Sequence, residues 1–166
     1  MYLHLIDIST IFVSMKKDTQ LSQIEKTVFY SIEKTIKTYR QFAQKNIKQN
    51  GIDITIDQWL ILKTIHDHPK ISQREIAATV FKDHASVTRM IELLVKRQFL
   101  IRSFHEEDRR RYSLSLTNEG KKIFKKLIPI VSHNRSTALA GIQIEDIEHL
   151  HKTLNTISNN CFNYST

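Results

Sequence analysis

The sequence predicts a mainly α fold of the α+β class, in which long helices accompany one small β-hairpin. Three observations support this prediction. The 166 residues include only 3 Gly and 2 Pro, which favours long helices with few tight turns. Ser or Thr followed three residues later by Glu or Gln, the capping-box signature of a helix start, recurs along the chain. Two short apolar stretches flank a charged run at 105–111, as in a β-hairpin.

Residues 1–18 are predicted to lie outside the main fold. The apolar stretch 8–13 has no basic leader and no small-residue cleavage site, so we do not expect a secretory signal. The stretch is also too short to span a bilayer. We expect an N-terminal extension that is either dispensable or folded as an additional helix.

A long helix is predicted for residues 19–50. Ser22 and Glu25 form a candidate capping box near its start, and Gly51 supplies its C-terminal stop. Apolar residues recur at three- and four-residue steps on one side: Leu21, Ile24, Val28, Ile32, Ile36 and Tyr39. Such a stripe needs a partner surface, so we expect a scaffold or dimerisation helix.

Capping residues mark the starts of three shorter helices. Thr55 and Gln58 form a capping box for the first, and Ser72 and Glu75 form one for the second. Asp83 can cap the third. The third helix has an apolar face at helical spacing, made of Val87, Ile91, Leu94 and Val95.

The helices that begin after Ser72 and Asp83 are joined by a tight connection, as in a helix-turn-helix. The second helix of that motif enters the major groove with its N-terminus first. Its candidate DNA-contacting residues are His84, Ala85, Ser86, Thr88 and Arg89. Small side chains permit close approach, and Arg89 can reach guanine or phosphate. Ser72, Gln73 and Arg74 are expected to support the motif from its first helix.

A β-hairpin with a basic tip is predicted after the helix-turn-helix. Its strands are residues 100–104 and 112–116, and the second alternates apolar with polar side chains as a half-buried strand does. The tip reads His105-Glu106-Glu107-Asp108-Arg109-Arg110-Arg111. Arginine is rarely buried without a partner, and its planar head suits phosphates and narrow grooves. We expect a wing that presents arginines to a polyanion.

Two further helices complete the chain. The first begins at Thr117, and Pro129 is expected to kink it or to end its first segment. Gly141 marks a break before the second. The last helix carries a regular apolar stripe of Ile144, Ile147, Leu150, Leu154 and Ile157.

The net charge of +8 is concentrated around the helix-turn-helix and the hairpin. Residues 82–126 contain 12 Lys and Arg and 6 Asp and Glu, a net charge of +6. This distribution is typical of a nucleic-acid-binding protein, although a solvated basic face would look the same. The single cysteine, Cys161, excludes an internal disulfide and favours a reducing, cytoplasmic location.

The order of elements resembles the MarR family of bacterial winged-helix transcriptional regulators over about residues 20–160. Three stretches carry the resemblance: Thr55-Ile56-Asp57-Gln58-Trp59-Leu60-Ile61-Leu62, Ser86-Val87-Thr88-Arg89-Met90-Ile91, and Asp108-Arg109-Arg110 with Leu116-Thr117-Asn118-Glu119-Gly120. Several fixed spacings agree in the last of these, the wing motif. The expected organisation is a winged helix-turn-helix at 53–117 and a dimerisation region of long helices at 19–50 and 120–162.

The resemblance implies a homodimer that binds a pseudo-palindromic operator on double-stranded DNA. The two recognition helices would sit in consecutive major grooves, roughly 34–36 Å apart. Arg110 would lie in or near the flanking minor groove, where narrow A·T-rich tracts attract arginine. Asp108 would brace a wing arginine, and Arg109 and Arg111 would be phosphate neighbours or strand-face residues.

Two positions depart from the family pattern. Gln98 stands in the turn after the recognition helix where the family usually has glycine, so Gln98 takes a positive φ or the turn differs. Glu107 replaces the proline often found before the acidic wing residue, which leaves the pose of the wing open.

The resemblance also implies a small aromatic or phenolic effector between the dimerisation helices and the DNA-binding lobe. Candidate pocket residues are Phe29, Tyr39, Phe42 and Trp59, each of which is by itself more often a core residue. No cofactor or metal is expected, because His149 and His151 do not share a helix face and no ligand cluster accompanies them. Nothing in the sequence stabilises a thiolate at Cys161.

The sequence therefore predicts a sequence-specific DNA-binding transcriptional regulator, most often a repressor, that a small ligand releases from DNA. No Ser-His-Asp arrangement, Gly-rich phosphate loop or paired-acid site indicates an enzyme. The alternatives are a non-specific architectural DNA-binding protein, a metal- or redox-responsive regulator, and a winged-helix module that binds only proteins.

Overall fold

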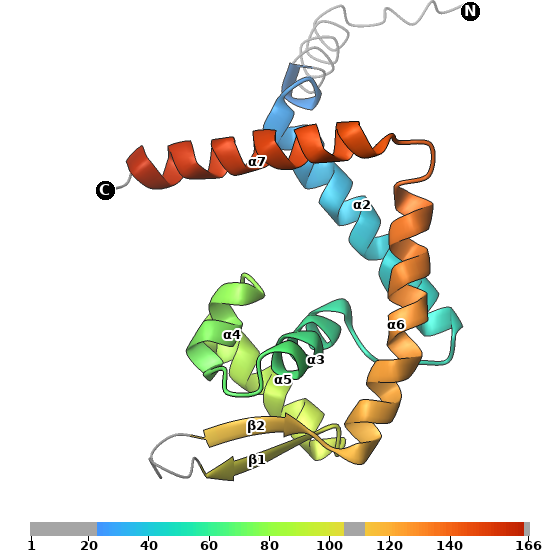
Figure 1. Cartoon of the computed structure of the whole chain (residues 1–166), viewed down its shortest axis with the longest axis vertical. Coiled ribbons are helices and arrows are strands. Elements are labelled where there is room, and N and C mark those ends of the chain that lie inside the picture. The colour runs from blue at the N-terminus through green and yellow to red at the C-terminus, as the bar shows by residue number, and fades with distance from the viewer. Residues whose placement is uncertain (1–22, 105–111, 165–166) are drawn as a thin grey trace, which may run out of the picture.

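The computed structural model describes residues 23–104 and 112–164, and its architecture is mainly helical with one two-stranded sheet (Figure 1). The elements are α2 (Val28–Gln49), α3 (Ile56–Asp67), α4 (Gln73–Thr79), α5 (His84–Lys96), β1 (Leu100–Phe104), β2 (Tyr112–Leu116), α6 (Asn118–Ala138) and α7 (Ile144–Tyr164). The helices α3, α4 and α5 gather with the hairpin into one lobe, and the long helices α2, α6 and α7 extend away from it. This arrangement confirms the predicted fold class and the winged helix-turn-helix.

The hairpin has the strand limits that the alternation of apolar residues predicted. β1 and β2 are antiparallel, and Leu100 pairs with Leu116 at the base of the hairpin. Leu100 and Leu114 are each 2% exposed, whereas Ile101 on the other face is 53% exposed. One face of the hairpin therefore closes the core of the lobe, as the period of two requires.

The core lies between α3, α4, α5, α6 and the hairpin, with the end of α2 at its edge. Residues that are completely buried there include Ile61, Leu62, Ile76, Val87, Ile91, Leu94 and Leu127. Trp59 of α3 stacks on Phe124 of α6 with ring centroids 4.9 Å apart, and Phe124 stacks on His66 at 4.3 Å. These stacked rings join the lobe to α6, so the lobe and the first half of α6 share one core.

Four helices of the lobe and its border begin where the capping residues predicted. Thr55 with Gln58, and Ser72 with Glu75, form complete capping boxes. Asp83 caps α5, and Thr117 caps α6 by accepting from the Gly120 N–H at 2.9 Å. Caps of this kind each stabilise a helix start by about 1 kcal/mol.

The prediction of one continuous helix over 19–50 is wrong at residues 26–27. A short helical segment over 23–25 ends there, and α2 begins after the N-cap residue Thr27. The Thr27 hydroxyl accepts from the Tyr30 N–H at 3.3 Å and donates to the Ile24 carbonyl at 2.8 Å. Threonine side chains offer the backbone such alternatives to continuous helix, which explains the break. The expected cap Ser22 lies outside the described residues.

Pro129 does not end a helix, because α6 runs without interruption from Asn118 to Ala138. A proline removes one backbone hydrogen bond, to the carbonyl four residues earlier. Here Phe124, Leu127 and Val131 are buried around it and hold the helix against the lobe. Of the two outcomes expected at Pro129, termination is therefore excluded.

Gln98 adopts the left-handed backbone conformation, with φ of 59°. This settles the choice that the sequence left open at this turn: the turn is of the glycine type, and a glutamine bears its strain. Phe81, in the turn between α4 and α5, also has a positive φ of 54°, which the sequence analysis did not predict.

Candidate nucleic-acid interface

The recognition helix α5 divides cleanly into a buried face and an exposed face. Val87, Ile91 and Leu94 are fully buried against the lobe. Among the predicted DNA-contacting residues, His84, Ala85 and Arg89 are exposed. The first turns of α5 therefore present one imidazole, one methyl group and one guanidinium to solvent, a set that can meet base edges and phosphates.

Ser86, one of the predicted DNA-contacting residues, has a structural role at the start of α5. Its backbone N–H donates to Asp83 Oδ1 at 2.8 Å, and its hydroxyl donates to Asp83 Oδ2 at 2.7 Å. These two bonds hold the pKa of Asp83 below its usual value, with the bond from the Ser86 hydroxyl contributing most. The cap remains charged at neutral pH, which suits the positive N-terminal end of the helix dipole.

Thr88 connects the two helices of the helix-turn-helix. Its hydroxyl donates to the His84 carbonyl at 2.9 Å and lies 3.4 Å from Oε1 of Gln73 in α4. Thr88 and Gln73 are both half-buried, and Arg74 beside them is exposed. The hydroxyl of Thr88 is thus already engaged within the motif, which favours a positioning role for Thr88 and Gln73.

The predicted wing contacts fall on residues that the structure leaves undescribed. Asp108, Arg109, Arg110 and Arg111 lie within 105–111, outside the described part of the chain. The flanking strands are described, and their last paired residues before the gap are Phe104 and Tyr112. The roles assigned to the four wing residues stay predictions.

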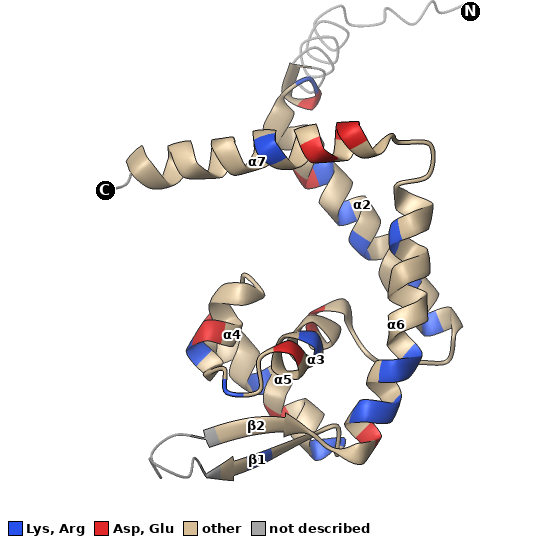
Figure 2. Cartoon of the chain, viewed as in Figure 1, with Lys and Arg blue, Asp and Glu red and all other residues tan. Residues whose placement is uncertain are grey.

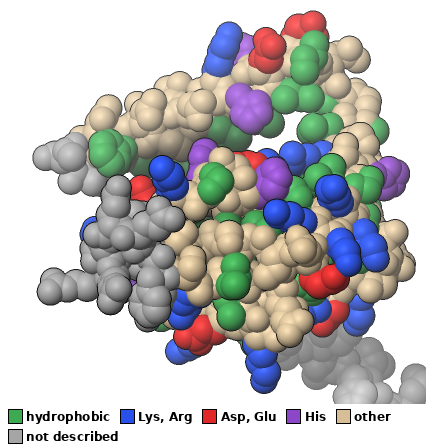
Figure 3. All heavy atoms as spheres, turned by 60° about the horizontal axis from the view of Figure 1, so that its bottom comes forward, with side chains coloured by type: hydrophobic (Ala, Val, Ile, Leu, Met, Phe, Trp, Pro, Cys, Tyr) green, Lys and Arg blue, Asp and Glu red, His purple; other side chains and the backbone are tan. Residues whose placement is uncertain are grey.

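Basic residues are concentrated in the lobe and in the first half of α6, and α7 shows no such concentration. Lys121, Lys122, Lys125 and Lys126 lie in the first half of α6, where Figure 2 shows basic residues in consecutive turns. By contrast, the first turn of α7 contains Glu145 and Asp146. On the face presented in Figure 3, Lys and Arg side chains are spread over the lobe, with acidic ones between them. The described residues thus agree with the charge distribution of the sequence.

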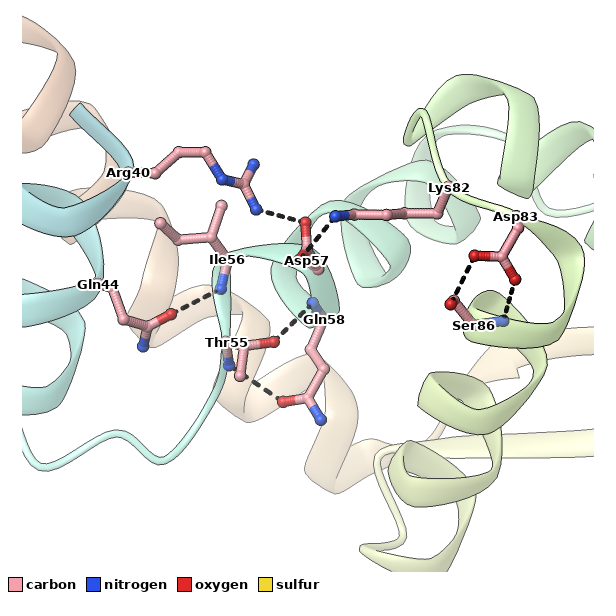
Figure 4. A network of polar contacts seen from close by, with 9 residues as sticks. All are labelled: Arg40, Gln44, Thr55, Ile56, Asp57, Gln58, Lys82, Asp83 and Ser86. Carbon is pink, nitrogen blue, oxygen red and sulfur yellow. Dashed lines mark hydrogen bonds and ion pairs between the residues drawn. The ribbon is translucent and has the colours of Figure 1, made fainter. Parts of the chain in front are cut away.

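One carboxylate that the sequence did not single out lies between α2 and the turn before the recognition helix. Asp57, in the first turn of α3, accepts from Arg40 Nη2 of α2 at 2.5 Å. Its other oxygen is 3.6 Å from Nζ of Lys82, the residue before the cap of α5 (Figure 4). The separations in sequence are too long for any local pattern to have signalled this network.

Three of the four residues predicted to line an effector pocket lie in α2 and the fourth lies in α3, and they differ in exposure. Trp59 is 5% exposed and belongs to the core, whereas Phe29 is 65% exposed near the start of α2. Phe29 and Tyr39 are roughly 15 Å apart along α2, since a helix rises about 1.5 Å per residue. Tyr39 and Phe42 are half-buried, so their exposure lies between that of Trp59 and that of Phe29. The pocket stays a prediction.

A separate open groove of about 830 Å³ lies between the end of α2 and α6. It is lined by Asn46, Ile52, Lys126, His133 and Asn134 among others, and by none of the four predicted pocket residues. Asn46 donates to Asn134 Oδ1 at 2.7 Å across the base of the two helices. Within the described ranges, no group of three or more His, Cys, Asp or Glu side chains could hold a metal ion. The same ranges contain no helix long and apolar enough to cross a membrane.

Comparisons with known proteins agree with this geometry. Residues 54–112 match the model of the MarR family. The HTH-type transcriptional regulator BilQ of Clostridium symbiosum is 29% identical over 127 residues, which cover 76% of this chain and 87% of BilQ. Among solved structures, the DNA complex of Staphylococcus aureus MepR gives a TM-score of 0.74 at 21% identity and covers 82% of this chain and 98% of MepR. Bordetella bronchiseptica BpsR, whose DNA binding is regulated by 6-hydroxynicotinic acid, gives 0.73 at 20% identity, with coverages of 81% and 94%.

Proposed function

The chain belongs to the MarR family of DNA-binding transcriptional regulators, and from this premise we propose that it is a homodimeric repressor of a pseudo-palindromic operator. The observation that carries the proposal is the first part of α5. Its N-terminus is capped by Asp83, its buried face is fixed in the core, and His84, Ala85 and Arg89 stand free for DNA. In a helix-turn-helix this is the end of the helix that enters the major groove.

The exposed apolar stripes of α2 and α7 support the homodimer. Val28 is 61% exposed and Ile36 is 49% exposed in α2, and Ile144 and Leu150 are 62% and 57% exposed in α7. Isolated exposed apolar residues are ordinary, but stripes at helical spacing on two long helices mark an association surface. A second copy of the chain would bring matching stripes and place two recognition helices on one duplex.

Release by a small ligand is the remaining part of the proposal. The likeness in fold to BpsR supports it, since 6-hydroxynicotinic acid regulates DNA binding by that protein. We propose that an aromatic or phenolic effector binds where the dimerisation helices meet the lobe, near Tyr39 and Phe42. Such a ligand would change the relative placement of the two recognition helices and so lower affinity for the operator. In this proposal the protein is not an enzyme and needs no cofactor.

The experiment is a selection of bound duplexes from a random pool at near-physiological salt, followed by titrations of the enriched duplex. We expect an enriched palindrome and a specific affinity at least 1,000-fold above that for random DNA, the range typical of specific regulators. Arg89→Ala should weaken binding of the enriched duplex by roughly 10-fold, because one good side-chain contact to a base is worth about 1–3 kcal/mol. Lys48→Ala, an exposed change in the last turn of α2, is the matched control and should have little effect.

Other outcomes would contradict the proposal in distinct ways. Equal affinity for enriched and random duplexes at every salt concentration would indicate an architectural DNA-binding protein. Failure to bind any duplex would indicate a winged helix that serves protein contacts alone. A monomer at the concentrations where the operator is bound would remove the homodimer from the proposal.

A further inference from the structure

Asp57 is the point at which three separate elements of the fold meet. It is the second residue of α3. Its Oδ1 accepts from Arg40 of α2 at 2.5 Å, and its Oδ2 lies 3.6 Å from Nζ of Lys82 in the turn between α4 and α5. Each oxygen of one carboxylate thus faces a cation from a different element, as Figure 4 shows.

The ion pair between Asp57 and Lys82 is next to the recognition helix, because Lys82 directly precedes the residue that caps α5. Lys82 precedes Asp83, whose carboxylate caps α5 through both the backbone and the hydroxyl of Ser86. The backbone of Lys82 is itself fixed, because its N–H donates to the Ala77 carbonyl at 3.0 Å. A displacement of Lys82 would therefore move the capped end of α5.

The contact on the Arg40 side is supported by a second bond set one helical turn further along α2. Gln44 Nε2 donates to the Ile54 carbonyl at 3.0 Å, and Gln44 Oε1 accepts from the Ile56 N–H at 3.0 Å. Arg40 and Gln44 are spaced i, i+4 and so share one face of α2. That face is docked on the start of α3, where Gln44 binds the backbone on both sides of the cap residue Thr55.

We propose that Asp57 is a positioning residue that sets the placement of the recognition helix relative to α2. The chain of contacts runs from Arg40 through Asp57 to Lys82 and then into the cap of α5. Since α2 carries part of the proposed dimer surface, Asp57 sets the distance and tilt between the two recognition helices of a dimer. This last step, from one chain to the spacing of two recognition helices, rests on the proposed function.

The side chains of this network are only partly buried, with 35% of Arg40, 24% of Asp57 and 39% of Lys82 exposed. Ion pairs at this depth contribute little to overall stability, so an isosteric neutral variant should fold. Asp57→Asn keeps the side-chain volume and the capped start of α3 but removes the charge that holds both cations. The matched control is Glu33→Gln, which removes the carboxylate of the exposed Glu33–Lys37 pair of α2 at 2.7 Å.

The first readout measures placement without DNA. Spin labels at position 45 of α2 and position 92 of α5, both exposed, in a Cys161→Ser background, report the α2–α5 distance within one chain. Dilution with unlabelled protein isolates the intramolecular distance in any oligomer. Asp57→Asn should shift or broaden this distance distribution, whereas Glu33→Gln should leave it as in the unsubstituted protein.

The second readout is binding to duplexes whose half-sites are moved apart or together by one base pair. For the unsubstituted protein we expect a loss of 10-fold or more on each change of spacing. Asp57→Asn should bind the best spacing about 5-fold less tightly and lose only 2- to 3-fold when the spacing changes. A purely structural role would lower affinity on all spacings alike.

An unchanged distance distribution in Asp57→Asn would overturn the inference, whatever happens to the thermal midpoint. It would also be overturned if Lys82→Gln weakened all duplexes equally and lowered the slope of log affinity against log salt by about 1, because Lys82 would then be a phosphate contact. If the unsubstituted protein showed no preference for half-site spacing, the proposed function would fail instead, and the distance measurement would still decide the role of Asp57.

Discussion

The helices α3 and α7 differ in how much of their apolar surface is buried within the chain. Six of the 12 residues of α3 are buried, including Trp59, Leu62 and Ile65. None of the 21 residues of α7 is buried, although its apolar stripe is the more regular of the two. Periodicity therefore predicts that a helix has a face to cover, and it does not say which molecule covers it.

The difference has an energetic side. Apolar surface gains about 25 cal/mol for each Å² removed from water, so the half-exposed stripe of α7 leaves much of its stabilisation unrealised within one chain. The lobe around α3 has already gained this stabilisation, because its apolar side chains are buried within the chain. We therefore expect substitutions in the lobe to change folding and substitutions on the α7 stripe to change association.

The largest effect should come from breaking the lobe at Gly120. A Cβ at this position would lie 1.9 Å from the Phe99 carbonyl oxygen, so the start of α6 could not stay against the turn between α5 and β1. Gly120→Ala should destabilise the fold by about 3 kcal/mol or more, at the upper end of the range for overpacking. Chemical denaturation monitored by circular dichroism measures this loss.

Gly141→Ala is the matched control. Gly141 has a φ of +79°, and no atom lies within 4 Å of an added Cβ, so only the backbone conformation opposes alanine. The cost should be about 1–2 kcal/mol, the usual penalty for a left-handed L-residue. Equal losses in the two variants would refute the close approach of α6 to Phe99.

The next largest effect should come from disrupting the exposed apolar stripe of α7. Leu150→Gln places an amide in the middle of the exposed stripe and should weaken dimerisation by 10-fold or more, with little change in the helix content of the separated chains. Lys152→Gln, on the opposite side of the helix by its spacing, should leave dimerisation unchanged. Sedimentation equilibrium over a range of concentrations measures both. Unaltered association in Leu150→Gln would show that the α7 stripe is not the dimer surface.

The smallest effect should come from a substitution that stabilises the lobe and leaves α7 unchanged. Gln98→Gly removes the strain of a glutamine at φ 59°. Relief of about 1–2 kcal/mol is partly offset by the greater freedom of glycine in the unfolded chain, so we expect a net gain of about 0.5–1 kcal/mol. Gln98→Ala keeps a Cβ and should show no such gain. The denaturation midpoint should rise for glycine only, while the dissociation constant of the proposed dimer stays the same.

Much of the structure of the candidate interface was predictable because its signals are local. Asp83 caps α5 three residues before Ser86, and the buried positions of α5 repeat every three or four residues, so the exposed residues His84, Ala85 and Arg89 follow from the pattern. The engagement of Thr88 with Gln73 did not follow, because it depends on how closely α4 packs against α5. The Thr88 hydroxyl donates to the His84 carbonyl within the motif, and its predicted contact with DNA stays a prediction.

The sequence by itself determined where most helices start, the limits of both strands and the identity of the faces to be covered. Those features depend on contacts three or four residues apart or on the alternation of a strand, and both can be counted along the chain. Only the tertiary structure decided that Asp57 joins Arg40 to Lys82, that Gly120 lies against Phe99 and that Trp59 stacks on Phe124. Each of these contacts brings together residues distant in sequence, and their meeting depends on how whole helices pack, which no local pattern encodes.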